Sequence, residues 1–179
     1  MKEPDHQDPT EPIRSLILSE RTVVIGMGNP DRADDGAGIE IVSHWKARLK
    51  ERAFLDTETS VETVVFDGLA DAEAEVFLFV DAADFGGRPG EFRLFGVKDT
   101  AEFHPAISTH KVPIDLLMGV IASKGRRAFL LGIQPESVEL FGGMTEEVAK
   151  AVEILERLVN QDINLRGSGL SKKSDQRAR

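Results

Sequence analysis

The chain has 179 residues, which is enough for one globular domain. Of these residues 41% are hydrophobic and 30% are charged, and this composition is too charged for a membrane-spanning protein. A formal net charge of -9 argues against nucleic acid as the main partner, because phosphate binding needs a basic surface. The absence of cysteine excludes disulfides, thiolate nucleophiles and cysteine-ligated metals, so any metal must be bound by oxygen and imidazole ligands.

The two ends of the chain differ in composition from the middle. Residues 1–20 are acidic and rich in proline, without the basic and apolar regions of a secretory signal, so we expect a disordered leader and a cytoplasmic protein. Residues 161–179 carry basic residues among Gly and Ser, which favours a disordered tail over a nucleic-acid-binding arm. Between them, residues 21–160 show no repeat and no boundary, which predicts one domain, and we expect a monomer.

Short apolar runs predict the strands. Thr22–Gly28, Val76–Asp81 and Ala128–Ile133 have the composition of strands buried on both faces of a parallel sheet. Val61–Phe66 is less uniformly apolar and is predicted as a further strand. Glu91–Phe95 alternates after a Gly- and Pro-containing turn, which predicts an antiparallel edge strand.

Apolar residues at helical spacing predict three helices between and after these strands. Thr145 is expected to cap the last of them, with two glutamates in its first turn. The alternation predicts an α/β three-layer sandwich, with a mostly parallel twisted sheet of about five strands, one antiparallel edge strand and helices on both faces, as in phosphorylase/hydrolase-like folds. The stripes are Ile39, Val42, Trp45 and Leu49; Ile114, Leu117, Met118 and Ile121; and Val148, Val152, Leu155 and Val159.

The run from Thr22 to Gly38 leads from a strand through glycines to paired acids, and it is typical of a ligand site at the carboxyl edge of a sheet. Its Gly26-x-Gly28 pair begins like a dinucleotide fingerprint. However, Asp31 stands at the third glycine position, and Asp34 and Asp35 would repel a pyrophosphate. The chain also lacks a Walker loop, a Gly-x-Ser-x-Gly elbow and a His-Glu-x-x-His helix.

Acids at predicted strand ends suggest a metal site instead. Asp35 follows the first strand, Asp67 and Asp81 end the next two, and His110 lies in a loop just before Pro113 and the following helix. If the strands are parallel, these acids share one sheet edge, and an Asp–Asp–His set suits nickel, zinc, iron or manganese.

Each of these residues also has a purely structural interpretation. Asp34 or Asp35 would serve equally as a helix cap, Asp67 and Asp81 as turn-closing side chains, and His110 as a loop histidine bonded to backbone. Another histidine, His44, is expected on the solvent face of its helix.

Several motifs in order make the chain resemble the hydrogenase maturation proteases, which trim the carboxyl end of the large subunit of nickel–iron hydrogenases. The resemblance covers nearly everything from Val23 to Leu158. It is carried by Gly26-x-Gly28-Asn29 with Asp34-Asp35-Gly36-x-Gly38, Val80-Asp81-Ala82, Ser108-Thr109-His110-Lys111-Val112-Pro113 and Gly132-Ile133-Gln134-Pro135-Glu136.

The resemblance implies roles for individual residues. Asp35, Asp81 and His110 match the metal-binding set of the family, and Asp67 matches an aspartate linked to substrate recognition, although Gly68-Leu69-Ala70 departs from the family's usual Gly-Gly followed by Thr or Ser. The nickel is expected to be presented by the hydrogenase large-subunit precursor, so that cleavage follows metal loading; the resemblance does not assign a resting metal. Two alternatives stay open, namely a non-cleaving checkpoint or chaperone for the precursor and a peptidase of another substrate on the same scaffold.

Overall fold

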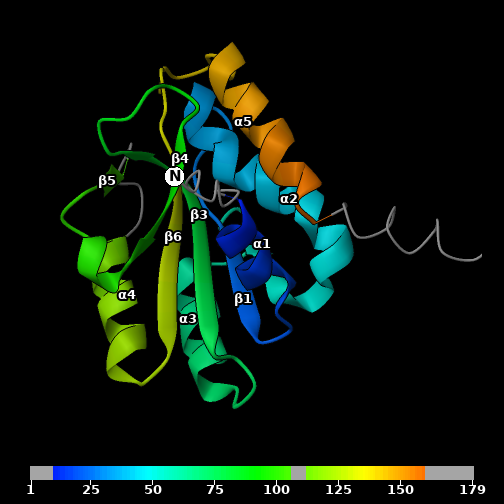
Figure 1. Cartoon of the computed structure of the whole chain (residues 1–179), viewed down its shortest axis with the longest axis vertical. Helices are drawn as coiled ribbons and strands as arrows, with labels where there is room; N and C mark the ends of the chain where they lie inside the picture. Colours follow the sequence, from blue (N-terminus) through cyan, green and yellow to red (C-terminus); the bar gives the residue numbers. More distant parts are fainter. Residues whose placement is uncertain (1–9, 106–111, 160–179) are drawn as a thin grey trace, which may run out of the picture.

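The computed structural model describes residues 10–105 and 112–159. Helices lie on both faces of a mostly parallel sheet (Figure 1), which confirms the predicted α/β sandwich. Within the described residues, five strands follow the order β2-β1-β3-β6-β4, and a sixth, β5, pairs with β3. The strands are β1 (Thr22–Gly26), β2 (Ala53–Leu55), β3 (Val76–Asp84), β4 (Phe92–Gly96), β5 (His104–Pro105) and β6 (Arg127–Ile133).

Strand direction divides the sheet as the sequence predicts. β1, β2, β3 and β6 are parallel to one another, whereas β4 runs antiparallel to β6 at the edge. The predicted strands at Thr22–Gly28, Val76–Asp81, Ala128–Ile133 and Glu91–Phe95 are therefore confirmed, with small shifts at their ends.

In the described residues five α-helices cover the sheet, and three of them, α2, α4 and α5, are those that the apolar stripes predict. Helices α1, α2 and α5 pack on one face, and α3 and α4 on the other. None of the helices in the described part of the chain has the length and apolarity that crossing a membrane requires. The helices are α1 (Glu11–Leu18), α2 (Ala37–Leu49), α3 (Val61–Ala70), α4 (Ile114–Ser123) and α5 (Glu146–Arg157), with short 3-10 turns at Ala33–Gly36, Lys50–Arg52 and Val97–Asp99.

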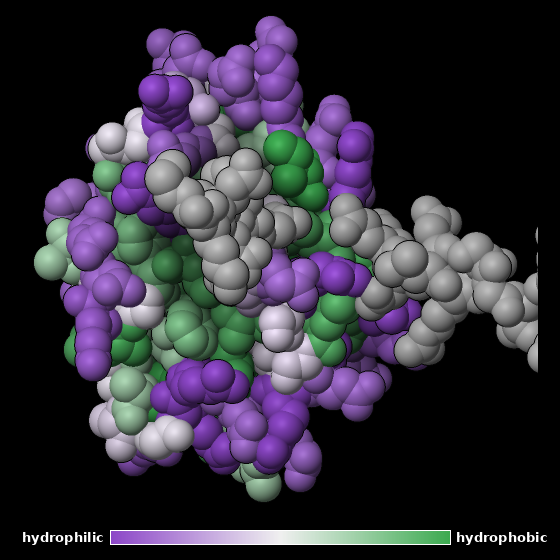
Figure 2. Space-filling model, in the orientation of Figure 1, coloured by the Kyte–Doolittle hydropathy of each residue, from purple (hydrophilic) through white to green (hydrophobic). Residues whose placement is uncertain are grey.

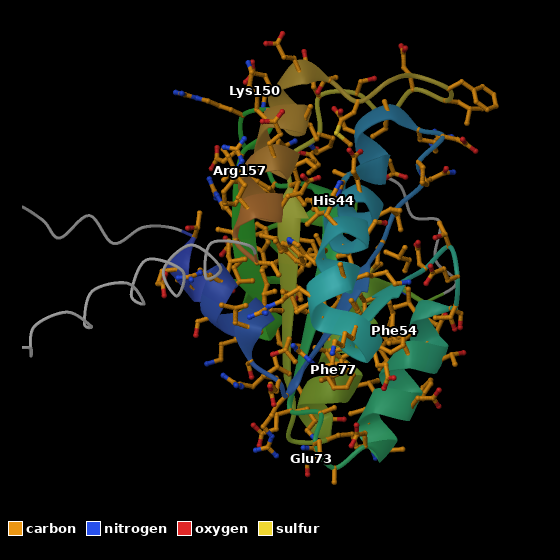
Figure 3. The ribbon with its side chains drawn as sticks, turned by 90° about the vertical axis from the view of Figure 1, so that its right-hand side faces the viewer. His44, Phe54, Glu73, Phe77, Lys150 and Arg157 are labelled. Carbon is orange, nitrogen blue, oxygen red and sulfur yellow. The ribbon has the colours of Figure 1, made fainter. Side chains whose placement is uncertain are left out.

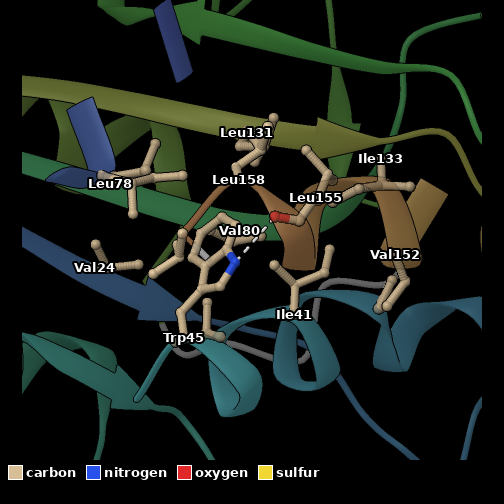
Figure 4. Close-up of a cluster of buried hydrophobic side chains, with 14 of the residues drawn as sticks. Val24, Ile41, Trp45, Leu78, Val80, Leu131, Ile133, Val152, Leu155 and Leu158 are labelled. Atoms are coloured by element: carbon tan, nitrogen blue, oxygen red, sulfur yellow. Dashed lines mark hydrogen bonds between the residues drawn. The ribbon is translucent and has the colours of Figure 1, made fainter. Parts of the chain in front are cut away.

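Alternating strand side chains build a core on each face. In β3, Leu78 and Val80 face α2 and α5, whereas Phe77 and Phe79 face α3 and α4. On the first face the fully buried Trp45 donates from its indole Nε1 to the carbonyl oxygen of Leu155 at 3.1 Å, which ties α2 to α5 (Figure 4).

Helices α1, α2 and α5 do not cover the whole of their face of the sheet. Phe92, Leu94 and Phe129 on β4 and β6 are only partly buried. Figure 2 accordingly shows apolar side chains gathered in the middle of this face, inside a largely hydrophilic rim. This surface lies at the edge of the sheet where β4 runs antiparallel to β6.

The predicted strand at Val61–Phe66 is wrong, because these residues form the first part of helix α3. Ser60 caps this helix by accepting a hydrogen bond from the Thr63 amide at 3.2 Å. Val61, Val64 and Val65 are buried, and their i, i+3, i+4 spacing makes one helical face, so tertiary packing outweighs the strand preference of β-branched residues.

The predicted disordered leader at residues 1–20 is also wrong in part. Glu11–Leu18 forms helix α1, which presents Ile13 and Ile17, four residues apart, to the core. Both side chains are buried, so this segment is part of the folded domain. The remainder of the leader and the predicted tail at 161–179 lie outside the described residues.

Candidate functional site

Three aspartates meet where the parallel strands β1, β2 and β3 reach their carboxyl ends. Asp35 lies in the 3-10 turn after β1, and Asp56 directly follows β2. Asp81 lies within β3, one residue beyond Val80, the partner of the last residue of β1. Because β1 and β2 stop here and β3 continues, the side chain of Asp81 stands at the edge where open α/β sheets bind their ligands.

The loop after β1 can approach these acids closely because it carries Gly28. Its φ is 121°, and a Cβ atom built on it would lie 1.8 Å from the carbonyl oxygen of Asp35 and 3.5 Å from Oδ1 of Asp81. Any side chain at this position would therefore displace the loop.

Backbone amides of the same loop hold two of the carboxylates in place. The Gly28 amide donates to Oδ2 of Asp56 at 3.2 Å, and the Asn29 amide donates to Oδ2 of Asp35 at 3.0 Å. Since Asp56 directly follows β2, the first of these bonds fixes the loop after β1 against the loop after β2, and the second holds Asp35 within its own loop.

Electrostatics sets Asp81 apart from an ordinary surface aspartate. Burial raises its pKa well above the usual value, and the negative charges of Asp35 and Asp56 raise it further. Three carboxyl groups so close together in a buried place repel one another, and a cation bound among them would offset that repulsion. Carboxylate oxygens are suitable ligands for such a cation.

The predicted metal set is only partly within the described structure. Asp35 and Asp81 are close enough to interact, as the sequence predicts, whereas His110 lies outside the described residues. Within residues 10–105 and 112–159, no three His, Asp or Glu side chains are arranged as a complete metal-binding group. The described carboxylates fit part of a cation site, and completing it requires another ligand.

Asp34, next to Asp35, has a structural position. Its side chain is fully buried and does not cap the following helix. Oδ2 accepts hydrogen bonds from the amides of Glu136 and Ser137 at 2.8 and 3.0 Å and from the Thr145 hydroxyl at 3.0 Å, and Oδ1 accepts from the Thr145 amide at 2.7 Å. Asp34 thereby holds the loop before α5 against the loop that carries Asp35.

The same loop contains two other residues that the sequence singles out. Thr145 is the N-cap residue of α5, as expected, but its hydroxyl bonds to Asp34 rather than accepting from the helix. Gln134 accepts from the amides of Phe85 and Gly87 through Oε1, at 2.9 and 3.0 Å. The motif from Gly132 to Glu136 thus ties together the loops after β3 and β6.

Asp67 does not reach this edge of the sheet. It belongs to helix α3 instead of ending a strand, and it lines a hollow of about 260 Å³ with Val23 and Arg52. The neighbouring Gly68 packs against Phe77, near the start of β3. Figure 3 shows Phe77 toward the end of the molecule opposite Lys150 of α5, so Asp67 lies by the amino ends of the strands.

Sequence reasoning missed Asp56, the carboxylate that does accompany Asp35 and Asp81. A signal was present, because Ala53-Phe54-Leu55 is an apolar run that ends in an acid, as Val80-Asp81 does. A run of three residues is too short to establish a strand by periodicity.

His44 lies on the exposed face of α2 as expected, with Nδ1 2.8 Å from Oε1 of Glu156.

Known proteins are similar to this chain over most of its length. The family model described as hydrogenase maturation protease matches residues 39–161. The hydrogenase 3 maturation protease of Escherichia coli K12 is 30% identical over 132 residues, which are 73% of this chain and 83% of that protein.

Solved structures agree with the sequence matches. The crystal structure of a nickel–iron hydrogenase maturation protease, HycI, from Thermococcus kodakarensis KOD1 superposes with a TM-score of 0.67 at 28% identity, covering 86% of this chain and 99% of that chain. The solution structure of the endopeptidase HycI from Escherichia coli gives a TM-score of 0.61 at 28% identity, covering 79% and 90%. The chain therefore belongs to the hydrogenase maturation protease family, the endopeptidases that cleave the carboxyl-terminal end of the nickel–iron hydrogenase large subunit.

Proposed function

We propose that this chain removes the carboxyl-terminal extension of a nickel–iron hydrogenase large-subunit precursor after nickel insertion, and that Asp35, Asp81 and His110 contact the nickel that the precursor presents. The observation that carries the proposal is the buried Asp81 carboxyl, held beside Asp35 and Asp56 with a raised pKa. Family membership and the protease function of the named relatives support the same reaction.

The carboxylates favour a substrate that already contains its metal. Without a cation, Asp35, Asp56 and Asp81 repel one another, whereas a nickel-loaded precursor brings a positive charge to them. Binding energy is thus available from the loaded substrate and not from the empty one, which makes cleavage conditional on metal insertion. Nickel bound by these residues would polarise a carbonyl oxygen or lower the pKa of a bound water.

Backbone amides of this chain hold the carboxylates of the site in position. The amides of Gly28 and Asn29 hold Asp56 and Asp35, so neither carboxylate has to reorganise when the substrate arrives. Asp81 retains its proton more readily than an exposed aspartate, and it would have to release that proton in order to bind a cation.

We further propose that Asp56, rather than Asp67, is the carboxylate that takes part in substrate recognition. Asp56 interacts electrostatically with Asp81, whereas Asp67 lines the hollow beside α3 near the amino ends of the strands. Cleavage assays of Asp56→Asn and Asp67→Asn decide between the two positions. We expect a strong loss for the first variant, and a loss confined to the second would contradict the assignment.

Mass spectrometry of the precursor tests the function directly. After incubation with this protein, the nickel-loaded precursor should lose the mass of its extension, and the nickel-free precursor should not. His110→Ala and Asp81→Asn should remain folded by circular dichroism and leave the precursor uncut. An unchanged mass with stable binding would indicate a non-cleaving checkpoint, and cleavage without nickel would indicate a peptidase of another kind.

Two further properties belong to the same proposal. The large-subunit precursor is the protein partner, and we propose that the enzyme acts on it as a monomer in the cytoplasm. Membership of the hydrogenase maturation protease family supports this location. Sedimentation of the free enzyme, followed by sedimentation with precursor, measures both stoichiometries.

A further inference from the structure

Two large apolar side chains are exposed side by side in the loop between β6 and α5. Leu140 is 54% exposed and Phe141 is 81% exposed. In the described part of the chain, the other exposed large hydrophobic residues occur singly on helices, such as Phe66 at 59%. Isolated apolar side chains on a surface are ordinary, whereas an aromatic ring this exposed beside a leucine is typical of a protein contact.

The backbone under these side chains is held in an unfavourable conformation. Phe141 has a φ of 60°, in the left-handed region that bulky residues rarely adopt. Its amide donates to the carbonyl oxygen of Asp31, and the amide of Gly142 donates to the carbonyl oxygen of Glu139 at 3.1 Å. The turn is therefore fixed with its apolar side chains outward instead of being free to fold them back.

This turn is also tied to the candidate site. Asp31 lies in the loop after β1 that carries Asp35, and Asp34 in that loop accepts four hydrogen bonds from the base of the turn's loop. A Cβ atom on Gly142 would lie 3.2 Å from the Cβ of Ala33, so the two loops pack closely. Figure 3 shows the gold loop before α5 reaching outward above the segment that leads into α2.

We propose that Leu140 and Phe141 form a docking contact for the folded body of the hydrogenase large-subunit precursor, inserting into an apolar recess on that protein. The inference rests on the proposed function, because it takes the precursor as the partner. A protein whose chain reaches Asp35 lies over the same pair of loops, so the turn is continuous with the surface that the substrate must cover. Preorganised aromatic side chains lose little conformational freedom on binding, which suits an anchor.

The test compares matched variants in the full chain. Phe141→Asn removes the ring while keeping a residue that tolerates positive φ, so the fold is retained. Leu140→Asn removes the second apolar group, and Phe66→Asn is the control, with comparable exposure on α3. For nickel-loaded precursor, we expect KM to rise about tenfold or more in each turn variant with kcat unchanged, and KM to stay within about twofold in the control.

The outcomes separate this inference from the proposed function. If the wild-type protein cleaves and both turn variants retain its KM, the docking contact is refuted while the function stands. If the wild-type protein does not cleave, the function fails, and the Kd for uncleaved precursor by surface plasmon resonance still decides whether the turn binds it. Dissociation of a wild-type dimer by Phe141→Asn, with an unchanged precursor Kd, would instead make the turn a contact between copies of this chain.

Discussion

Asp34 and Asp81 are both buried aspartates, yet the structure predicts opposite effects on stability when each is replaced by asparagine. The Asp34 carboxylate accepts hydrogen bonds from three backbone amides and one hydroxyl. Asp81 is buried close to two other carboxyl groups, which with desolvation raise its pKa. We expect Asp34→Asn to destabilise the protein and Asp81→Asn to stabilise it at neutral pH.

The magnitude for Asp34 follows from its partners. An amide side chain has a single acceptor oxygen, so in either orientation an NH₂ group faces at least one buried donor, such as the Thr145 amide. One unpaired buried donor and the loss of charge-assisted bonds cost together about 2–4 kcal/mol. For a chain of this length that lowers the Tm by roughly 5–15 °C.

The sign for Asp81 follows from linkage. Because its pKa is raised in the folded state, the folded protein binds the proton more tightly than the unfolded chain, and wild-type stability falls as pH rises through that pKa. An asparagine does not titrate. The stability advantage of Asp81→Asn should therefore be absent where the carboxyl is protonated in both states, and it should grow toward neutral pH.

Chemical denaturation in a chelator-containing buffer, repeated from acidic to neutral pH, measures both effects. Cleavage assays on the same samples should show that Asp81→Asn is inactive although it is more stable. The reasoning would be refuted if Asp81→Asn destabilised the protein as much as Asp34→Asn, or if its advantage over the wild type shrank with rising pH.

Two other predictions concern backbone approach and the amino-terminal helix. Gly28→Ala should destabilise by about 3 kcal/mol or more and abolish cleavage, because the added Cβ would lie 1.8 Å from the carbonyl oxygen of Asp35. Gly125→Ala, at a glycine that also has a positive φ (74°) but open space around it, should cost far less. Equal losses in urea denaturation would contradict the steric cause. Ile17→Ala should lower the free energy of unfolding by about 2–5 kcal/mol, because the side chain is fully buried. Ile154→Ala, at a half-exposed position, should have little effect. An unchanged Tm for Ile17→Ala would show that α1 does not belong to the core.

The sequence predicted the elements that have a clear hydrophobic pattern, either a continuous apolar run or a regular apolar stripe. β3 and β6 are continuous apolar runs buried between two layers of helices, and α2 and α5 carry regular apolar stripes. The edge strand β4 was recognisable because it alternates and follows a Gly- and Pro-containing turn.

Helices α1 and α3 were missed for different physical reasons. The eight residues of α1 follow a proline-rich acidic stretch, so composition hid the pair Ile13 and Ile17. In α3, the β-branched residues Val61, Val64 and Val65 favour a strand locally, and only packing against β1 and β3 selects the helix. Misassigning α3 also moved Asp67 to the wrong edge of the sheet.

The candidate site was predictable where an acid follows a recognised strand. Asp35 and Asp81 satisfy that rule, and the structure brings them close enough to interact. Asp56 follows a strand of three residues, and such a strand exists because β1 offers it a partner, with Val24, Ile25 and Gly26 pairing to Ala53, Phe54 and Leu55. Its position was therefore a consequence of tertiary pairing and not of local pattern.

Asp34 and Asp35 are consecutive acids in one loop, and they have different roles that the sequence alone does not distinguish. Asp34 accepts hydrogen bonds from the loop before α5, and Asp35 accepts one from Asn29 in its own loop. The 3-10 turn that contains both directs neighbouring side chains to different sides, so one carboxylate is satisfied by protein donors and the other remains next to Asp81. Gly28 lies so close to the Asp35 carbonyl oxygen that an added Cβ would be 1.8 Å from it, so a side chain there would displace the loop that carries both acids. The glycine thus permits the loop conformation in which Asp34 bonds to the loop before α5 and Asp35 lies near Asp81.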